Sequence, residues 1–219
     1  RIAMRHGGGA GGPTIFDWQS GALTKGEKFV SAYHAMRRTW ATRDGDGAGD
    51  GDGDDLAVLR VSHRALLRRV VFAMRDAIAD TFGDERVRAL RAAKPLFISH
   101  MRSGVAPRTT NDEYWHEHVD TIAYEAFTYT ALLYLSDADV EFGGGHFEFI
   151  DADARHVVTP RAGRVLMFSS GAENTHRVTR VTRGERMALT VAFTCDERHG
   201  VADDELLSDG DTHFFAPDP

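Results

Sequence analysis

The sequence predicts a mainly β protein of the α+β class, in which N-terminal helices support a core of two β-sheets. Three observations favour this fold. Strong helical periodicity is confined to the first 94 residues. From about residue 95 onward, short runs rich in Val, Phe, Tyr and Thr alternate with Gly and Asp turns. A chain of 219 residues with 42% hydrophobic content is long enough for one domain with a substantial core.

The N-terminal part divides into a lead-in and a helical support region over 24–94. Residues 1–23 are rich in Gly and are expected to form a flexible lead-in. Thr24 is a candidate cap for a helix over 24–40. Aromatic and apolar side chains recur there at helical spacing, at Phe29, Tyr33, Met36 and Trp40.

Residues 44–55 consist almost entirely of Asp and Gly. A calcium loop of the EF-hand type needs a single Gly at its sixth position and a Glu at its twelfth. Here Gly alternates throughout and no Glu closes the loop, so we expect a disordered acidic surface loop.

A stronger helical pattern covers residues 62–82, and Gly83 is expected to end it. The arginines of this segment lie largely off its apolar stripe and are expected to form a solvated face. The stripe consists of residues four apart, namely Leu66, Val70, Met74 and Ile78.

Eight strands are predicted in the core region, 95–196, and a polar C-terminal tail follows over 197–219. Short strands at such spacing are typical of a sandwich or barrel. The predicted strands are 96–101, 114–120, 128–136, 146–151, 154–159, 164–169, 175–181 and 187–195.

Composition excludes several classes of function. The net charge of −7 argues against nucleic acid as a partner, because phosphate binding favours a basic face. Cys195 is the single cysteine, which excludes an intrachain disulfide and a zinc–thiolate site. The longest uncharged apolar stretch, 126–135, is half of the roughly 20 residues of a membrane helix, so no membrane segment is expected. Because the sequence opens at Arg1 rather than Met, we expect it to be part of a longer protein.

Three ligand-type residues predict a metal site. His118 and Asp120 are two apart, so in a strand both side chains point to the same face. His176, at the head of another predicted strand, supplies a third ligand. Two His and one carboxylate form the facial triad of non-haem Fe(II) oxygenases. Tetrahedral zinc accepts the same donors, so the triad leaves the metal open.

Arg186 follows His176 by ten residues, at the start of the next strand. Strand alternation places Arg186, Ala188 and Thr190 on one face, where the small side chains leave room. A guanidinium can hold a carboxylate through two parallel hydrogen bonds. A co-substrate with a chelating end and a carboxylate tail would fit, and 2-oxoglutarate has that shape. Tyr134 is a candidate to add a hydroxyl to the same cofactor site.

Two nearby motifs have competing interpretations. His116 shares the strand parity of His118, so a His-x-His site of the cupin type is the alternative to a role beside the ligands. The glycines at 143–145 lack the Lys and Ser/Thr of a phosphate-binding loop, so we expect a tight turn or bulge there.

The arrangement of these motifs resembles the 2-oxoglutarate- and Fe(II)-dependent oxygenases of the prolyl 4-hydroxylase-like group. His118-Val119-Asp120, His176 and Arg186 match the HxD…H…(R/K) pattern of that family, and supporting motifs occur at 133–136, 143–149 and 160–168. The resemblance covers roughly half of the chain, about residues 95–196.

The resemblance implies a double-stranded β-helix core of the jelly-roll, cupin-like type. It implies Fe(II) bound by His118, Asp120 and His176, with the C5 carboxylate of 2-oxoglutarate held by Arg186 and Tyr134. O2 is the second co-substrate and ascorbate a candidate reductant. The expected reaction hydroxylates a C–H bond, first of all on a protein or peptide side chain, and decarboxylates 2-oxoglutarate to succinate and CO2. The alternatives are a small-molecule hydroxylase of the same chemistry and a non-enzymatic cupin-like binding module.

Overall fold

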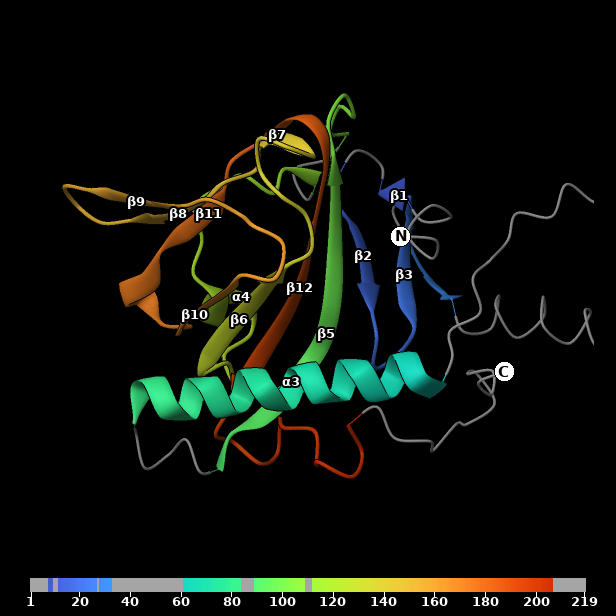
Figure 1. Ribbon diagram of the computed structural model, residues 1–219, viewed down its shortest axis with the longest axis vertical. Coiled ribbons are helices and arrows are strands. Elements are labelled where there is room, and N and C mark those ends of the chain that lie inside the picture. The colour runs from blue at the N-terminus through green and yellow to red at the C-terminus, as the bar shows by residue number, and fades with distance from the viewer. Residues whose placement is uncertain are drawn as a thin grey trace, which may run out of the picture.

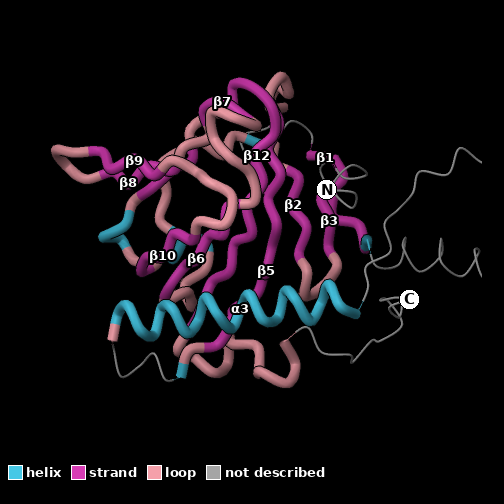
Figure 2. Tube along the Cα trace, in the orientation of Figure 1, coloured by secondary structure: helices cyan, strands magenta, loops and turns pink. Residues whose placement is uncertain are grey.

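The computed structural model describes residues 8–9, 12–26, 28–32, 61–83, 89–108 and 112–206. These residues form two β-sheets and one long helix, α3 (Val61–Phe82), which crosses the larger sheet (Figures 1 and 2). A short helix, α4 (Asp120–Ala123), and a 3-10 turn, η3 (Ala172–Asn174), complete the helical elements described. The strands are β1 (Gly8–Gly9), β2 (Thr14–Asp17), β3 (Ala22–Gly26), β4 (Lys28–Ser31), β5 (Arg91–Arg102), β6 (Tyr129–Tyr134), β7 (Phe142–Gly144), β8 (Phe147–Ile150), β9 (Arg155–Val158), β10 (Val165–Ser169), β11 (His176–Val178) and β12 (Val181–Thr194).

The larger sheet has the strand order β1-β3-β2-β5-β12-β6-β10, with β4 paired to β3 and β7 paired to β12. All of its pairs are antiparallel except β1 with β3. The smaller sheet has the order β11-β8-β9. Its β8–β9 hairpin projects from the body of the molecule at the left of Figure 1.

An apolar interior joins the two sheets. Met101 of β5, Leu132 of β6 and Phe168 of β10 come from the larger sheet, and Phe147 of β8 and Val178 of β11 come from the smaller one. These side chains are buried in a single cluster. The predicted two-sheet β core is therefore confirmed.

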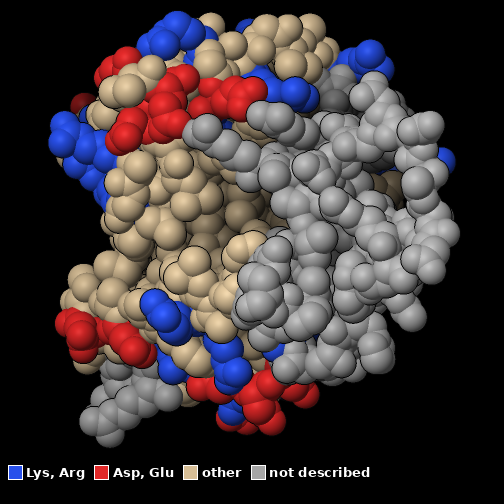
Figure 3. Space-filling view, turned by 45° about the vertical axis from the view of Figure 1, so that its right-hand side comes forward, with Lys and Arg blue, Asp and Glu red and all other residues tan. Residues whose placement is uncertain are grey.

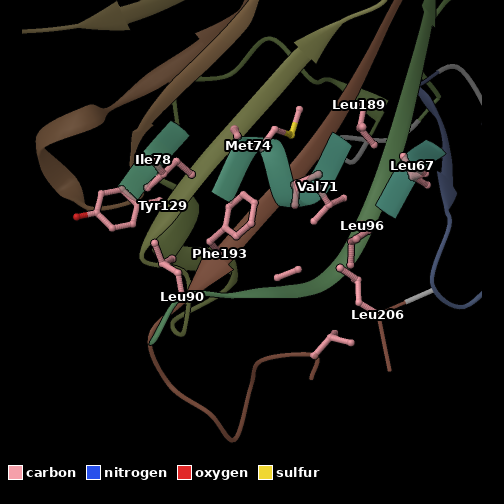
Figure 4. Close-up of a cluster of buried hydrophobic side chains, with 14 residues drawn as sticks. Leu67, Val71, Met74, Ile78, Leu90, Leu96, Tyr129, Leu189, Phe193 and Leu206 are labelled. Atoms are coloured by element: carbon pink, nitrogen blue, oxygen red, sulfur yellow. The ribbon is translucent and has the colours of Figure 1, made fainter. Parts of the chain in front are cut away.

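Helix α3 covers the opposite face of the larger sheet (Figure 4). The prediction of this helix is confirmed, and Gly83, at φ +60°, follows its last residue. The predicted stripe is partly wrong, because Leu66 is 53% exposed. With 3.6 residues per turn, steps of four drift around the helix by about 40° each. The buried stripe instead mixes steps of three and four, through Leu67, Val71, Met74 and Ile78.

The helix predicted from residue 24 is wrong at its start. Strands β3 and β4 occupy 22–26 and 28–31, and they extend the larger sheet through β2. Thr24 accepts a hydrogen bond from the Ile15 amide at 2.8 Å rather than capping a helix. The pairing with β2 is non-local and outweighs the local helical spacing. Residues 33–60, which hold the rest of that helix and the Asp/Gly loop, lie outside the described residues.

Parts of the predicted lead-in and tail also belong to the folded body. Phe16 of β2 is buried, so the expected flexible lead-in is wrong at this strand. Val201 and Leu206 of the predicted tail are buried against α3 and β5. Arg75 of α3 makes an ion pair with Asp203 at 2.8 Å, so the predicted solvated arginine face is partly occupied by this segment.

The surface carries charges of both signs. On the face shown in Figure 3, the described Lys and Arg side chains alternate with Asp and Glu, and no continuous basic surface is seen there. A helix suited to spanning a bilayer, which needs about 20 mostly apolar residues, does not occur among the described helices.

Replacing Ile78 by Ala tests the packing of α3. Ile78 is fully buried, so the Ile78→Ala variant should lose roughly 2–5 kcal/mol of unfolding free energy, measured by urea denaturation. The exposed Leu66→Ala variant is the control and should change by less than about 0.5 kcal/mol. Equal losses at the two positions would contradict the observed face of the helix.

Candidate metal centre

His118, Asp120 and His176 come together as the sequence predicts. Their ligand atoms all lie within 4.8 Å of one another. Asp120 Oδ1 lies 3.6 Å from His176 Nε2 and 3.9 Å from His118 Nε2. The three side chains could therefore hold one metal ion.

A backbone bridge holds the two histidines side by side. The amide of each donates to the carbonyl of the other, with both hydrogen bonds at 2.9 Å. Residues that exchange both bonds in an antiparallel pair project their side chains from the same face. The two imidazole centres are consequently 4.4 Å apart.

The strand predicted over 114–120 is wrong, although His118 and Asp120 do point to the same side, as that strand implied. Within this segment only His118 makes a strand-like pairing, and Asp120 begins α4. Val119 between them is extended, at φ −122° and ψ 132°. This one extended residue suffices to turn His118 and Asp120 to the same side.

Hydrogen bonds from Nδ1 fix how each histidine presents its other nitrogen. Nδ1 lies 3.0 Å from the His116 carbonyl in His118 and 2.8 Å from the Asn174 carbonyl in His176. A carbonyl only accepts, so Nδ1 carries the proton and Nε2 keeps a lone pair for a metal. Burial also lowers the pKa of His176 below its ordinary value, which keeps this ring neutral near pH 7.

Thr130 of β6 holds the carboxylate of Asp120. Its hydroxyl donates to Asp120 Oδ2 at 2.6 Å and lies 2.9 Å from the Ser170 hydroxyl. Oδ1 is thereby left to face the two histidines. Thr130 was not predicted from the sequence, although it shares the strand parity of Leu132 and Tyr134, whose side chains are also buried.

Aromatic rings enclose His176 from the interior. Phe147 stacks on the imidazole with centroids 4.8 Å apart and planes at 16°. Phe168 meets it edge-on at 5.0 Å. Both rings are buried, so they restrict the imidazole to one orientation and exclude water from that side.

A network of ion pairs holds the segment around His118 against the smaller sheet. Glu117 and Arg177, the neighbours of the two histidines, join Glu148 and Arg155 of the smaller sheet. Arg177 Nε lies 2.8 Å from Glu148, and Arg155 lies 3.5 Å from it. Both arginines also lie 3.8 Å from Glu117. These contacts tie the His118 segment to β8, β9 and β11.

Arg186 is a buried cation with unused hydrogen-bonding capacity. It is 1% exposed, and its Nε donates to the Gly145 carbonyl at 2.9 Å. Its Nη2 has no hydrogen-bond partner among the described residues, and neither does the buried hydroxyl of Tyr134. The guanidinium carbon lies 5.4 Å from the centre of the Tyr134 ring.

Burial raises the pKa of Tyr134 to about 12 and lowers the pKa of Arg186. Tyr134 is therefore a protonated donor at neutral pH, and Arg186 still keeps its charge. A buried cation with an unpaired donor is costly. Two such unpaired donors close together, with the guanidinium carbon of Arg186 5.4 Å from the Tyr134 ring centre, suit an incoming carboxylate.

Gly145 allows Arg186 to occupy this position. At φ +64°, a Cβ on Gly145 would lie 2.9 Å from Cδ of Arg186. The adjacent Gly144, at φ +67°, passes so close to the Arg180 carbonyl that a Cβ would lie 2.1 Å from its oxygen. Of the predicted turn or bulge at 143–145, the bulge is confirmed, because Gly143 and Gly144 lie in β7 and its pairing with β12 shifts register between Val181 and Arg183.

Two other predicted residues, Thr190 and His116, lie apart from the metal-ligand candidates and from the Arg186–Tyr134 pair. Thr190 is half-buried on the same strand face as Arg186, but four residues, or about 13 Å, further along β12. His116 is absent from the metal-ligand cluster, and its Nε2 lies 2.5 Å from Glu113. The structure thus gives no support to the His-x-His alternative.

A cavity of about 930 Å³ lies at the other end of β12, between segments 124–128 and 194–200. None of the three metal-ligand candidates lines it. Arg186 and Tyr134 do not line it either.

Comparisons with known proteins agree with this geometry. Residues 105–200 match the sequence model of the 2OG-Fe(II) oxygenase superfamily. The chain is 43% identical over 197 residues to "2-oxoglutarate and iron-dependent oxygenase domain-containing protein 3" of Xenopus tropicalis, covering 90% of this chain and 57% of that protein. It is 42% identical over 99 residues to human "Prolyl 3-hydroxylase 1", covering 44% of this chain and 13% of that protein.

Among solved structures, a Pseudomonas putida prolyl-4-hydroxylase aligns with a TM-score of 0.45 and 20% identity, covering 74% of this chain and 84% of that one. The chain spans just over half the length of the Xenopus relative. These findings identify a 2OG-Fe(II) oxygenase superfamily domain in residues 105–200 of the chain.

Proposed function

We propose that the chain is an Fe(II)- and 2-oxoglutarate-dependent dioxygenase that hydroxylates a C–H bond on a protein or peptide side chain. The observation that carries this proposal is the convergence of His118, Asp120 and His176 within 4.8 Å. The buried Arg186 and the superfamily match support the same conclusion.

The three side chains fit a ferrous ion. Two Nε2 lone pairs and one carboxylate oxygen are the donors of a facial triad, which leaves three positions of an octahedral ion open. Zinc accepts the same donors, and the superfamily match favours iron. Thr130 and the two backbone carbonyls hold the ligands in place before the metal arrives.

The unpaired donors of Arg186 and Tyr134 fit the C5 carboxylate of 2-oxoglutarate. Arg186 Nη2 and the Tyr134 hydroxyl are buried without a hydrogen-bond partner in the described part of the chain, and a carboxylate would accept from both. We assign Thr190 a place on the wall between the carboxylate site and the metal ligands, because it pairs with Leu132, which lies between Tyr134 and Thr130 on β6. When bound, the metal, 2-oxoglutarate and O2 supply the oxidising chemistry, in which 2-oxoglutarate is decarboxylated to succinate and CO2.

The remaining residues orient the site and shield it. Phe147 and Phe168 fix the His176 ring and keep water from the inner side of the centre. His118 is 48% exposed, so the outer side of the triad opens to solvent. This opening suits a substrate that approaches as an extended segment. The relative named prolyl 3-hydroxylase favours proline as the first side chain to examine.

Uncoupled turnover tests the proposed function without a known substrate. The purified chain is incubated with Fe(II), 2-oxoglutarate, O2 and ascorbate, and succinate is measured by mass spectrometry. We expect succinate formation that stops when a chelator removes the metal. Intact-mass screening of peptides and cell extract for a gain of one oxygen then separates peptide from small-molecule substrates. A binding module without enzymatic activity would give no succinate.

Removing His176 should abolish metal binding, because two ligands rarely retain the ion. The His176→Ala variant is titrated with Co(II) and followed by visible absorption. The His156→Ala variant is the control, since His156 is 66% exposed and pairs with Asp151 instead. Wild-type succinate formation by His176→Ala would refute the ligand assignment.

Removing Arg186 should weaken the co-substrate rather than the metal. Charge-assisted hydrogen bonds are worth about 1.5–3 kcal/mol, so Arg186→Ala should raise the Kd of 2-oxoglutarate roughly 10- to 150-fold. The Kd is measured anaerobically by calorimetry on the Mn(II)-loaded protein. The exposed Arg161→Ala variant should bind normally. An unchanged Kd in Arg186→Ala would show that the guanidinium serves another purpose.

A methyl group at Gly145 should weaken 2-oxoglutarate binding by displacing the side chain of Arg186. Gly145→Ala and Gly163→Ala both place Ala at positive φ, which costs about 1–2 kcal/mol of stability, and Gly145→Ala should lose more because its Cβ would also lie 2.9 Å from Cε2 of Phe142. Only at Gly145 does the new Cβ meet Arg186, because nothing lies within 4 Å of the Cβ position at Gly163. Calorimetry should therefore show weaker 2-oxoglutarate binding in Gly145→Ala alone, and equal affinities would contradict this role.

A further inference from the structure

A small cavity opens where β5 ends and β12 begins. Its volume is about 220 Å³. Arg102, the last residue of β5, and Arg180, just before β12, both line it, together with Tyr114, Trp115 and Val105. We call this cavity the arginine hollow. It is smaller than the roughly 300–1,000 Å³ of typical ligand pockets, so it suits one side chain rather than a whole cofactor.

Glu185 lies opposite Arg102 in the β5–β12 pairing, but its carboxylate lies 3.1 Å from His100 Nε2 and makes no ion pair with either arginine of the hollow. Among the described residues, neither Arg102 nor Arg180 makes an ion pair. The chain as a whole has 33 acidic against 26 basic side chains, and Arg75, Arg91, Arg155, Arg177 and Arg198 all have carboxylate partners. Two unpaired guanidinium groups at one cavity therefore attract an anionic group.

Contacts with aromatic side chains fix the position of the Arg180 guanidinium before a ligand binds. Its guanidinium lies over the Trp115 ring, 4.2 Å from the centroid. Trp115 packs edge-on against Tyr114 at 5.2 Å, and the Tyr114 hydroxyl accepts a hydrogen bond from the Val181 amide at 2.9 Å. Ordering the cation before binding reduces the entropy that a ligand must overcome.

The hollow lies near the candidate metal centre along the chain. Trp115 precedes His118 by three residues, and Arg180 follows His176 by four. Consecutive Cα atoms are 3.8 Å apart, which limits these separations to about 11 and 15 Å. An extended peptide advances about 3.3 Å per residue, so a few residues cover this span.

We infer that the arginine hollow binds the carboxylate of an acidic residue, Asp or Glu, a few positions from the target residue of a peptide substrate. The inference rests on the proposed function, since a flanking residue matters only if the substrate is a peptide. A single carboxylate matches the size of the hollow and the fork geometry of the two guanidinium groups.

Binding is tested first on the metal-free chain without 2-oxoglutarate. The chain has three Trp residues, so the indole N–H resonance of Trp115 can be assigned with a Trp115→Phe variant. The probes are the peptides Ac-Gly-Glu-Gly-NH2 and Ac-Gly-Gln-Gly-NH2. We expect the Glu peptide to shift this resonance saturably and the Gln peptide to bind at least 10-fold more weakly.

Variants decide whether the arginines cause the binding. Arg180→Gln and Arg102→Gln should each weaken the Glu peptide about 10-fold or more, whereas the exposed Arg161→Gln control should bind it normally. Equal affinity for the Glu and Gln peptides, or an unchanged affinity in both variants, would overturn the inference. A phosphoserine peptide that binds more than 10-fold tighter than the Glu peptide would overturn the carboxylate assignment.

A paramagnetic ion tests the position of the hollow relative to the centre. Mn(II) bound by His118, Asp120 and His176 should broaden the resonances of the bound Glu peptide, and His176→Ala should abolish the effect. Metal binding that leaves the peptide resonances sharp would overturn the substrate role. Failure to bind Mn(II), read by electron paramagnetic resonance, would instead count against the proposed function and leave the peptide titration as a separate result.

Discussion

The candidate centre depends above all on the pair of backbone hydrogen bonds between His118 and His176. These two 2.9 Å bonds fasten a turn-rich segment to the edge of the smaller sheet. Fixing the backbone of one residue costs about 1–2 kcal/mol in conformational entropy. Folding has already ordered the backbone at His118 and His176, so metal binding does not have to order it again. The orientation of Asp120, two residues later, follows from the same anchor.

Strand β12 links this centre to the core of the protein. One of its faces packs Leu189, Val191 and Phe193 against α3 and the end of the described chain. The other carries Arg186, whose buried guanidinium depends on the bare backbone of Gly145 for its position. Alternate residues of one strand therefore contribute to the core and position Arg186, so a shift of β12 would disturb both.

Much of the fold was predictable from local patterns, and the failures have a common cause. Helix α3 and most core strands follow from periodicity, and the spacing of His118, Asp120 and His176 predicted their convergence. The strand at 114–120 was wrong because one extended residue, Val119, replaces it. The helix predicted over 24–40 was wrong where β3 and β4 form, because strand pairing with β2 is not visible in the local spacing of residues. Thr130 and the Glu117–Arg177 contact escaped prediction for the same reason. The assignment of iron ligands and of the Arg186, Tyr134 and Thr190 cofactor site stays a prediction.

The most direct test of the account is anomalous diffraction from crystals grown anaerobically with Fe(II) and 2-oxoglutarate. Data collected on both sides of the iron edge locate the ion without assuming its ligands. We expect one peak within bonding distance of His118 Nε2, Asp120 Oδ1 and His176 Nε2, with a carboxylate of 2-oxoglutarate against Arg186. A peak elsewhere, or an ordered co-substrate that leaves Arg186 unpaired, would contradict it.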